Sequence, residues 1–306
     1  MHSNFMDAVR ARSDQAIASG DLQPIVAEQV VIEDQGLPFT VRWVAALAAK
    51  DAAKPRAAAA APATADSQAS ILPGGPRDPD FNPFLKPDPA LLVGPVGDHH
   101  AAILNKFPVC LHHLVLARRA FAEQRSPLEA IDFQALAFML SHEGGLGFYN
   151  GGPAAGASQR HKHVQWIPAA PDNASLRALG AGLPSGQAQG TVVRHPALAM
   201  AHCFVRVDAG LGADAGASAQ AMGIAFGQAC AALDLRPDAD GLLPPCNMLV
   251  GDGWMLVLPR SQEHFQGVSL NALSFGGTIY VRDPAQIDAI RAAGPLRALA
   301  SVGVPG

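Results

Sequence analysis

An Asp-Gly turn between two apolar runs is the feature that most constrains the fold of this chain. Residues 247–250 and 254–259 flank Gly251-Asp252-Gly253. Such a turn joins antiparallel strands, because its residues adopt positive φ angles that match the strand twist. A second strand pair is predicted at 25–33 and 37–46, around Asp34-Gln35-Gly36. We therefore expect an antiparallel sheet built partly from hairpins.

Helical patterns are fewer than strand patterns. They predict helices over residues 7–19, 126–141 and 218–233, and Asp283-Pro284 begins a final helix. In the second helix, Ser126 is the expected N-cap, with Pro127 at the first helical position and Glu129 completing a capping box. Together these elements favour an α+β fold with helices flanking an antiparallel sheet.

Composition narrows the class of protein. The chain has 306 residues, 49% hydrophobic and 16% charged, which is typical of a globular protein large enough for a sizeable core. The net charge of -4, with no basic tract, predicts no nucleic-acid partner. We find no stretch of eighteen apolar residues, no apolar leader and no secreted disulfide framework, so we expect a soluble cytoplasmic protein without a membrane partner.

Residues 54–77 differ in composition from the rest of the chain. This segment is rich in alanine and proline and ends with Pro73-Gly74-Gly75-Pro76. It is typical of a solvated linker or a mobile lid. Lys54 and Arg56 flank its start, so a lid that contacts phosphate is one interpretation and a featureless loop is the other.

A pair of histidines behind a glycine-rich run indicates chemistry. In His161-Lys162-His163-Val164-Gln165, an extended backbone places His161, His163 and Gln165 on one face. Residues 151–159 precede it, and a glycine-rich loop lets backbone N–H groups approach an anion. A phosphate bound there would lie within reach of an imidazole, which suggests nucleotidyl transfer through a histidine adduct.

A metal fragment is the alternative for two histidines two residues apart. The four cysteines are scattered and form no CxxC pair that could complete a zinc site, so we expect no metal ligands. The members of the pairs His99-His100 and His112-His113 point to opposite faces if extended. We therefore expect structural roles for both pairs.

The order of these motifs resembles one family. The chain is similar to the ATP adenylyltransferases, also called diadenosine tetraphosphate phosphorylases, of the histidine-triad superfamily. The resemblance covers about residues 40–282 and is carried by Asn82-Pro83-Phe84, residues 104–109, His113, residues 148–153, 156–159, 161–165, 246–249 and 254–260, and Asn271-Ala272-Leu273-Ser274-Phe275-Gly276-Gly277.

This resemblance implies a fold and a reaction. The fold would be the histidine-triad-like antiparallel sheet, shared with galactose-1-phosphate uridylyltransferase. The chain would be a single adenylyltransferase domain over 1–306, with its catalytic part at about 82–282. The enzyme would cleave diadenosine polyphosphates with inorganic phosphate to ATP and ADP, reversibly, as a monomer. It would carry no covalently bound cofactor, and Mg²⁺ would accompany the polyphosphate.

The resemblance also assigns roles to residues. His163 would be the nucleophile, His161 would orient it, and Gln165 would bind a non-bridging oxygen or the adduct. The expected substrate-binding residues are Lys54, Asn105, Lys106, Asn150, Gly156, Ala157, Ser158, Gln159 and Asn271, with Arg260 as a further candidate.

Some residues depart from the family pattern, and some alternatives stay open. The family's lysine-rich segment is reduced to Lys50, Lys54 and Arg56, and Trp166 stands where an aliphatic residue is expected. The same adduct could be resolved by water, or belong to a sulfate or adenylylsulfate transferase. A non-catalytic nucleotide sensor is the non-enzyme alternative.

Overall fold

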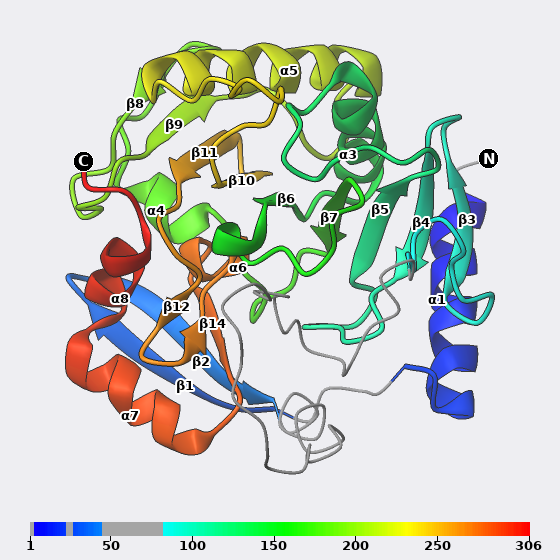
Figure 1. Cartoon of the computed structure of the whole chain (residues 1–306), viewed down its shortest axis with the longest axis horizontal. Coiled ribbons are helices and arrows are strands. Elements are labelled where there is room, and N and C mark those ends of the chain that lie inside the picture. The colour runs from blue at the N-terminus through cyan, green and yellow to red at the C-terminus, as the bar shows by residue number, and fades with distance from the viewer. Residues whose placement is uncertain (1–2, 23–26, 45–81) are drawn as a thin grey trace, which may run out of the picture.

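A nine-stranded antiparallel sheet forms the centre of the molecule (Figure 1). The computed structural model describes residues 3–22, 27–44 and 82–306. The strand order is β3-β4-β5-β7-β6-β10-β11-β9-β8. In chain order the strands are β3 (Leu92–Val96), β4 (His100–Leu104), β5 (Leu114–Arg118), β6 (Leu146–Gly151), β7 (His163–Ile167), β8 (Val192–Val193), β9 (Cys203–Arg206), β10 (Cys246–Gly251) and β11 (Trp254–Pro259).

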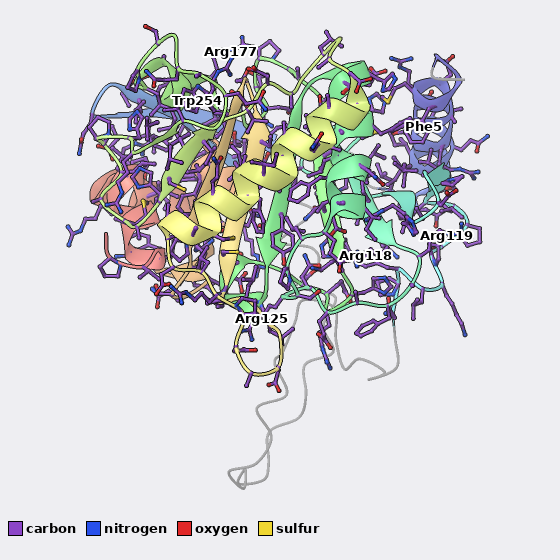
Figure 2. All side chains as sticks on the ribbon, turned by 90° about the horizontal axis from the view of Figure 1, so that it is seen from above. Phe5, Arg118, Arg119, Arg125, Arg177 and Trp254 are labelled. Atoms are coloured by element: carbon purple, nitrogen blue, oxygen red, sulfur yellow. The ribbon has the colours of Figure 1, made fainter. Side chains whose placement is uncertain are left out.

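Two layers cover this sheet. On one face, α3 (Ala130–Glu143) and α5 (Ala215–Ala232) pack against each other, and α5 crosses the sheet in Figure 2. Helix α1 (Ser3–Ser19) lies beside β3. The other face carries a second sheet of β1 (Ala27–Asp34), β2 (Leu37–Val44) and β14 (Thr278–Val281), together with α4 (Arg177–Ala181), α6 (Ala272–Phe275), α7 (Pro284–Ala293) and α8 (Pro295–Val302).

The central strand pair joins the two halves of the chain. Strand β6 pairs with β10 in the register Phe148↔Leu249 and Asn150↔Asn247. The strands before it in the order lie within residues 92–167, and the strands after it lie within residues 192–259. Glycine is required on β6, because a Cβ on Gly151 would lie 2.8 Å from the Cys246 carbonyl oxygen. Side chains placed on β6 and on β10 therefore meet in the middle of the molecule.

The hairpin predictions are confirmed. Strands β10 and β11 pair around Asp252 and Gly253, whose φ angles are 50° and 79°. Strands β1 and β2 pair around Gln35 and Gly36 in the same way. Between α5 and α6 the chain also forms the small pair β12 (His264–Phe265) and β13 (Val268–Ser269). The 54–77 segment lies outside the described residues.

The predicted start of the second helix is wrong by three residues. Helix α3 has Glu129 as its N-cap, and the capping box joins Glu129 to Asp132. Ser126 instead donates its hydroxyl to the Glu123 carbonyl at 2.8 Å. The carbonyls of Ser126 and Pro127 accept from the Lys162 ammonium rather than from helical N–H groups. A distant lysine therefore overrides the local helix signal.

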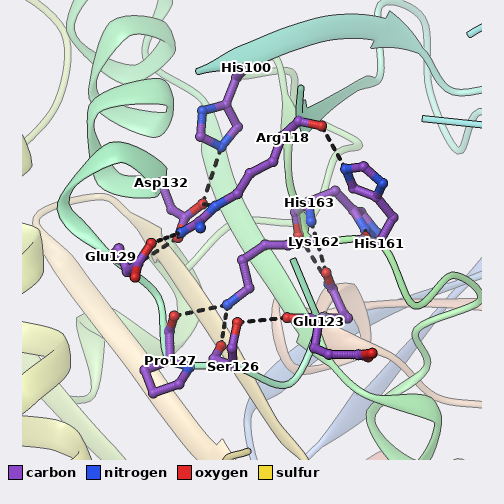
Figure 3. Close-up of polar contacts among 11 residues, drawn as sticks. His100, Arg118, Glu123, Ser126, Pro127, Glu129, Asp132, His161, Lys162 and His163 are labelled. Atoms are coloured by element: carbon purple, nitrogen blue, oxygen red, sulfur yellow. Dashed lines mark hydrogen bonds and ion pairs between the residues drawn. The ribbon is translucent and has the colours of Figure 1, made fainter. Parts of the chain in front are cut away.

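A buried ion pair fixes α3 on the sheet (Figure 3). The carboxylate of Asp132 accepts from Arg118 Nε at 2.8 Å, from its terminal nitrogen at 2.5 Å and from His100 Nε2 at 3.2 Å. Burial opposes ionisation, but these hydrogen bonds and the Arg118 charge hold the pKa of Asp132 well below its usual value. The network ties the first turn of α3 to β4 and β5. Within the described helices, none is long and apolar enough to span a bilayer.

Candidate active site

Strand β7 places two of the predicted catalytic side chains in one cavity. His163 and Gln165 alternate with Val164 and Trp166, and all four are buried. The first two line a cavity of about 950 Å³, while Val164 and Trp166 belong to the core on the other face. The period-2 geometry of a strand separates the two sets. Other lining residues come from segments 83–91, 103–115, 148–159 and 267–286.

The ring of His163 has a defined tautomer. Its Nδ1 lies 2.8 Å from the His161 carbonyl oxygen. A carbonyl only accepts, so Nδ1 carries the proton and Nε2 keeps its lone pair. No described residue hydrogen-bonds Nε2, and the Phe84 ring packs on the imidazole with centroids 4.9 Å apart. Burial lowers the pKa of His163 to about 4, so the ring is neutral at pH 7.

His161 lies beneath the cavity, not in it. Its Nε2 donates to the Arg118 carbonyl at 2.6 Å, and its Nδ1 accepts from the Asn82 amide at 2.9 Å. The Oδ1 atom of Asn82 accepts from the N–H groups of Phe84 and Leu85. The imidazole of His161 thus anchors the strand and the Asn82 turn. It is the backbone carbonyl of His161, rather than its ring, that orients the nucleophile candidate.

Gln165 is oriented by a histidine that we expected to be structural. His113 is buried, lines the cavity and has Nε2 2.9 Å from Gln165 Oε1. The amide oxygen only accepts, so the His113 Nε2 carries the proton. Burial lowers the pKa of His113 to about 4, which keeps the ring neutral. With its oxygen engaged, Gln165 has its NH₂ group left to donate to a ligand in the cavity.

The N–H groups of the glycine loop are arranged differently from our expectation. The N–H groups of Ala155 and Ala157 donate to Gly152, and that of Gly156 donates to Pro153. These donors close the loop's own turn and do not point at an anion. Gly156 is needed for close packing instead, because its φ is 88° and a Cβ there would lie 2.7 Å from the Asn271 Cβ. The side chains of Ser158 and Gln159 line the cavity, where a ligand would meet them.

The predicted asparagines line the cavity, but each also has a structural hydrogen bond. Asn150 Oδ1 accepts from Asn247 Nδ2 at 2.8 Å and from the Ala272 N–H at 3.0 Å. Asn271 caps α6 through the Leu273 N–H at 3.0 Å. Asn105 accepts from the Phe107 N–H and faces the His113 ring at 3.3 Å. Their remaining amide groups border the cavity.

Cations border the cavity at its exposed edge. Lys86 and Lys106 are exposed lining residues, and Arg282, which directly follows β14, also lines the cavity. Lys54, the other predicted cation, lies outside the described residues. Arg260 is buried away from the cavity, where it donates to the Asn247 amide and to the Leu270 carbonyl. No three His, Cys, Asp or Glu side chains of the described segments gather at metal-ligand spacing.

Sequence reasoning missed three residues that shape the site: His113, Asn82 and Gln124. His113 is among the residues that carry the resemblance, but as half of an adjacent pair it was assigned only a structural role. Because His112 has a φ of 60°, the backbone at this pair is not extended, and the argument from opposite faces does not apply. Asn82 opens a motif that carried the resemblance, which was the available signal. Gln124 lies in no motif, and only the structure places it.

Comparisons with known proteins agree with this geometry. Residues 1–178 match the family model of the Ap4A phosphorylase N-terminal domain, and residues 196–305 match that of the ATP adenylyltransferase C-terminal domain. A Saccharomyces cerevisiae diadenosine 5',5'''-P1,P4-tetraphosphate phosphorylase 2 is 28% identical over 236 residues, which are 68% of this chain and 70% of that protein. The yeast Protein APA1 is 34% identical over 96 residues, covering 28% and 30% of the two chains.

Solved structures share the fold. The structure of yeast Ap4A phosphorylase Apa2 in complex with Ap4A has a TM-score of 0.74 at 21% identity, covering 99% of this chain and 98% of that one. The complex with AMP has a TM-score of 0.76 at the same identity, covering 99% and 97%. These matches confirm the predicted α+β, histidine-triad-like fold. Because the N-terminal family model spans more than half of the chain, the chain belongs to the Ap4A phosphorylase and ATP adenylyltransferase family of enzymes.

Proposed function

We propose that this enzyme cleaves diadenosine tetraphosphate with inorganic phosphate to give ATP and ADP. The observation that carries the proposal is the unprotonated Nε2 of His163 at a cavity of about 950 Å³. Membership of the family and the yeast phosphorylase relative support this substrate class. We also propose that a single chain is the active unit, as the resemblance to the family implies.

The reaction has two displacements at one phosphorus atom. The Nε2 lone pair forms a bond to the α-phosphorus of one adenosine, and the bond from that phosphorus to its bridging oxygen breaks. ATP leaves with the electron pair. A phosphate oxygen then attacks the same phosphorus, the N–P bond breaks and ADP is released. Because each step is a simple displacement, the sequence also runs in reverse and makes diadenosine tetraphosphate from ATP and ADP.

The surroundings of His163 suit the charge that develops. In the adduct the ring becomes cationic, and the His161 carbonyl already accepts from Nδ1–H, so it stabilises that cation. The Gln165 NH₂ group, held by His113, donates to a non-bridging oxygen. Such a donor contributes roughly 10²–10³ in rate. Ser158, Gln159 and Lys106 would bind the departing phosphates, and Mg²⁺ would enter bound to the polyphosphate itself.

The test is product analysis with and without phosphate. Purified protein is mixed with diadenosine tetraphosphate and magnesium, and the nucleotides are separated by ion exchange. We expect ATP and ADP only when phosphate is present. ATP and AMP regardless of phosphate would mean that water resolves the adduct and would overturn the phosphorolysis. An absence of turnover would overturn the substrate assignment and direct the search to other adenylyl donors, beginning with adenylylsulfate.

A further inference from the structure

The pairing of β6 with β7 stops two residues short of the nucleophile candidate. The strands pair as Leu146↔Ile167, Gly147↔Trp166 and Phe148↔Gln165. Continued in the same register, the ladder would next pair Tyr149 with Val164 and then Asn150 with His163. That pair would exchange backbone hydrogen bonds across the cavity floor. Both strands extend to these residues, yet the pairs are missing.

A side chain occupies the position of the missing backbone bonds. The Gln124 Oε1 atom accepts from the His163 N–H at 2.8 Å. Its Nε2 donates to the Asn150 carbonyl at 2.9 Å and to the His163 carbonyl at 3.0 Å. One amide thus lies between the donor and the acceptor that a continuous ladder would have joined directly. Gln124 is 2% exposed, so these hydrogen bonds are shielded from water.

The segment that carries Gln124 is itself fixed at several points. The Gln124 N–H donates to the Arg160 carbonyl at 2.7 Å, and the Tyr149 hydroxyl donates to the Gln124 carbonyl. Two residues on, the Lys162 ammonium donates to the carbonyls of Ser126 and Pro127 (Figure 3). Lys162 lies between the two histidines, with its side chain fully buried. The segment and β7 therefore hold each other in place.

We propose that Gln124 is a positioning residue for the adenylyl transfer: its side-chain amide keeps β6 and β7 apart and sets the backbone of His163. Hydrogen-bonded strands lie about 4.8 Å apart, which leaves no room for an inserted amide. The insertion therefore splays the strands where the glycine loop leaves β6. Without it, the His163 N–H would bond to the Asn150 carbonyl directly, and the imidazole would move with its backbone.

The effect on the reaction follows from geometry. A misplacement of about 1 Å between reacting atoms costs roughly 10²-fold in rate. Gln124 does not line the cavity, so its loss should leave nucleotide binding largely unchanged. The role is thus expected in the chemical step. This inference rests on the proposed function for its kinetic readout, but its structural readout does not need turnover.

The first experiment uses Gln124→Met, which keeps the size of the side chain and removes its hydrogen bonds. We expect the single-turnover release of ATP from diadenosine tetraphosphate to slow by about 10- to 100-fold. The Kd for AMP should change by less than about threefold, because no lining residue is altered. A matched control is Met222→Ala in α5, a buried change far from the cavity that also lowers stability. The control should keep the rate within about twofold.

The second experiment reports on His163 directly by ¹⁵N NMR of histidine-labelled protein, with His163→Ala to assign the signals. The wild type should show the neutral Nδ1–H tautomer, and Gln124→Met should mix the two tautomers. Unchanged His163 signals together with a rate within twofold of wild type would overturn the proposal. So would an equal loss of rate in Met222→Ala, because the effect would then follow stability alone.

If Gln124→Met does not fold, a second variant that introduces a carboxyl group tests the same proposal. In Gln124→Glu a carboxylate would face the carbonyls of Asn150 and His163, whereas the protonated acid regains a donor. Its activity relative to wild type should therefore rise as the pH falls from 8 to 5.5, and a flat ratio would overturn the proposal. If wild type does not cleave the substrate, the proposed function fails, and the NMR comparison still decides the role of Gln124.

Discussion

A neutral imidazole with one blocked nitrogen is the central chemical feature of this site. Burial lowers the pKa of His163, and the His161 carbonyl holds the proton on Nδ1. An exposed histidine would be partly protonated near its usual pKa of about 6.5, and the protonated fraction would have no lone pair with which to attack. The same burial therefore makes the Nε2 lone pair available at pH 7. The position of the ring thus sets its protonation state.

Substitution of the proposed nucleophile should separate chemistry from binding. His163→Ala is expected to abolish the release of ATP from diadenosine tetraphosphate, because the other imidazole that lines the cavity, His113, has its Nε2 bonded to Gln165 and its Nδ1 bonded to the Val109 N–H. AMP should still bind within about threefold of wild type, since the side chains proposed to bind phosphate remain. Turnover is followed by ion exchange and binding by calorimetry. His264→Ala, on an exposed residue of β12, is the control and should behave as wild type. Surviving turnover would show that His163 is not the nucleophile.

The pH dependence of the first displacement should follow the two buried histidines. The pKa values of His163 and His113 are both lowered to about 4 by burial. Each ring is neutral above this value, so single-turnover ATP release should be level from pH 8 down to about 5. It should fall as the pH passes through 4, when Nε2 of His163 gains a proton. A fall centred near 6.5 would mean that the ring titrates like an exposed histidine.

Elements of this fold were predictable where the signal was local. Hairpin turns and the pattern of β7 follow from residue types that lie next to one another in the chain. The start of α3 did not follow, because the carbonyls of Ser126 and Pro127 bind a lysine about 35 residues away. The position of Gln124 between the strands was also not predictable, since no sequence pattern indicates a side chain that takes the place of a strand pair. Long-range polar contacts override local preference in both cases.

The attachment of α3 to the sheet should depend on one carboxylate. Asp132→Asn is expected to lower the free energy of unfolding by about 3 kcal/mol, because it leaves the Arg118 guanidinium buried without its principal counterion. Urea unfolding at pH 7 measures the change. Asp288→Asn is the matched control, because Asp288 pairs with Arg291 at 78% side-chain exposure and should cost less than about 1 kcal/mol. Equal losses in the two variants would contradict a special role for the buried pair.

At the scale of the whole molecule, the stability of the protein should fall in mild acid. His113 and His163 have pKa values near 4 when folded and near 6.5 when unfolded. Between these values the unfolded chain binds more protons, so the free energy of unfolding decreases as the pH falls from about 6.5 to 4, by of order 3 kcal/mol for each ring. Urea unfolding at a series of pH values tests this. His163→Ala should reduce the slope, and an unchanged slope would contradict the assignment.

Much of the candidate site was predictable as a set of residues, but its arrangement was not. The motifs placed His163, Gln165, Asn150 and Asn271 correctly around one cavity. The sequence does not indicate that the Asn150 oxygen accepts hydrogen bonds from Asn247 and Ala272. Nor does it indicate that the N–H groups of the glycine loop donate within the loop itself. Such details depend on which strands become neighbours, and this follows from packing of the entire sheet.

The pairing of β6 with β10 has a consequence for the order in which activity can arise during synthesis. His163 leaves the ribosome about a hundred residues before Asn271 and Arg282, which complete the cavity wall. Until β10 is synthesised, that edge of β6 has no strand partner, and the Asn150 side chain lacks its hydrogen-bond partners Asn247 and Ala272. An incomplete chain would therefore carry the proposed nucleophile without the cavity around it. The cavity that the proposed reaction needs is therefore complete only after these later residues are synthesised.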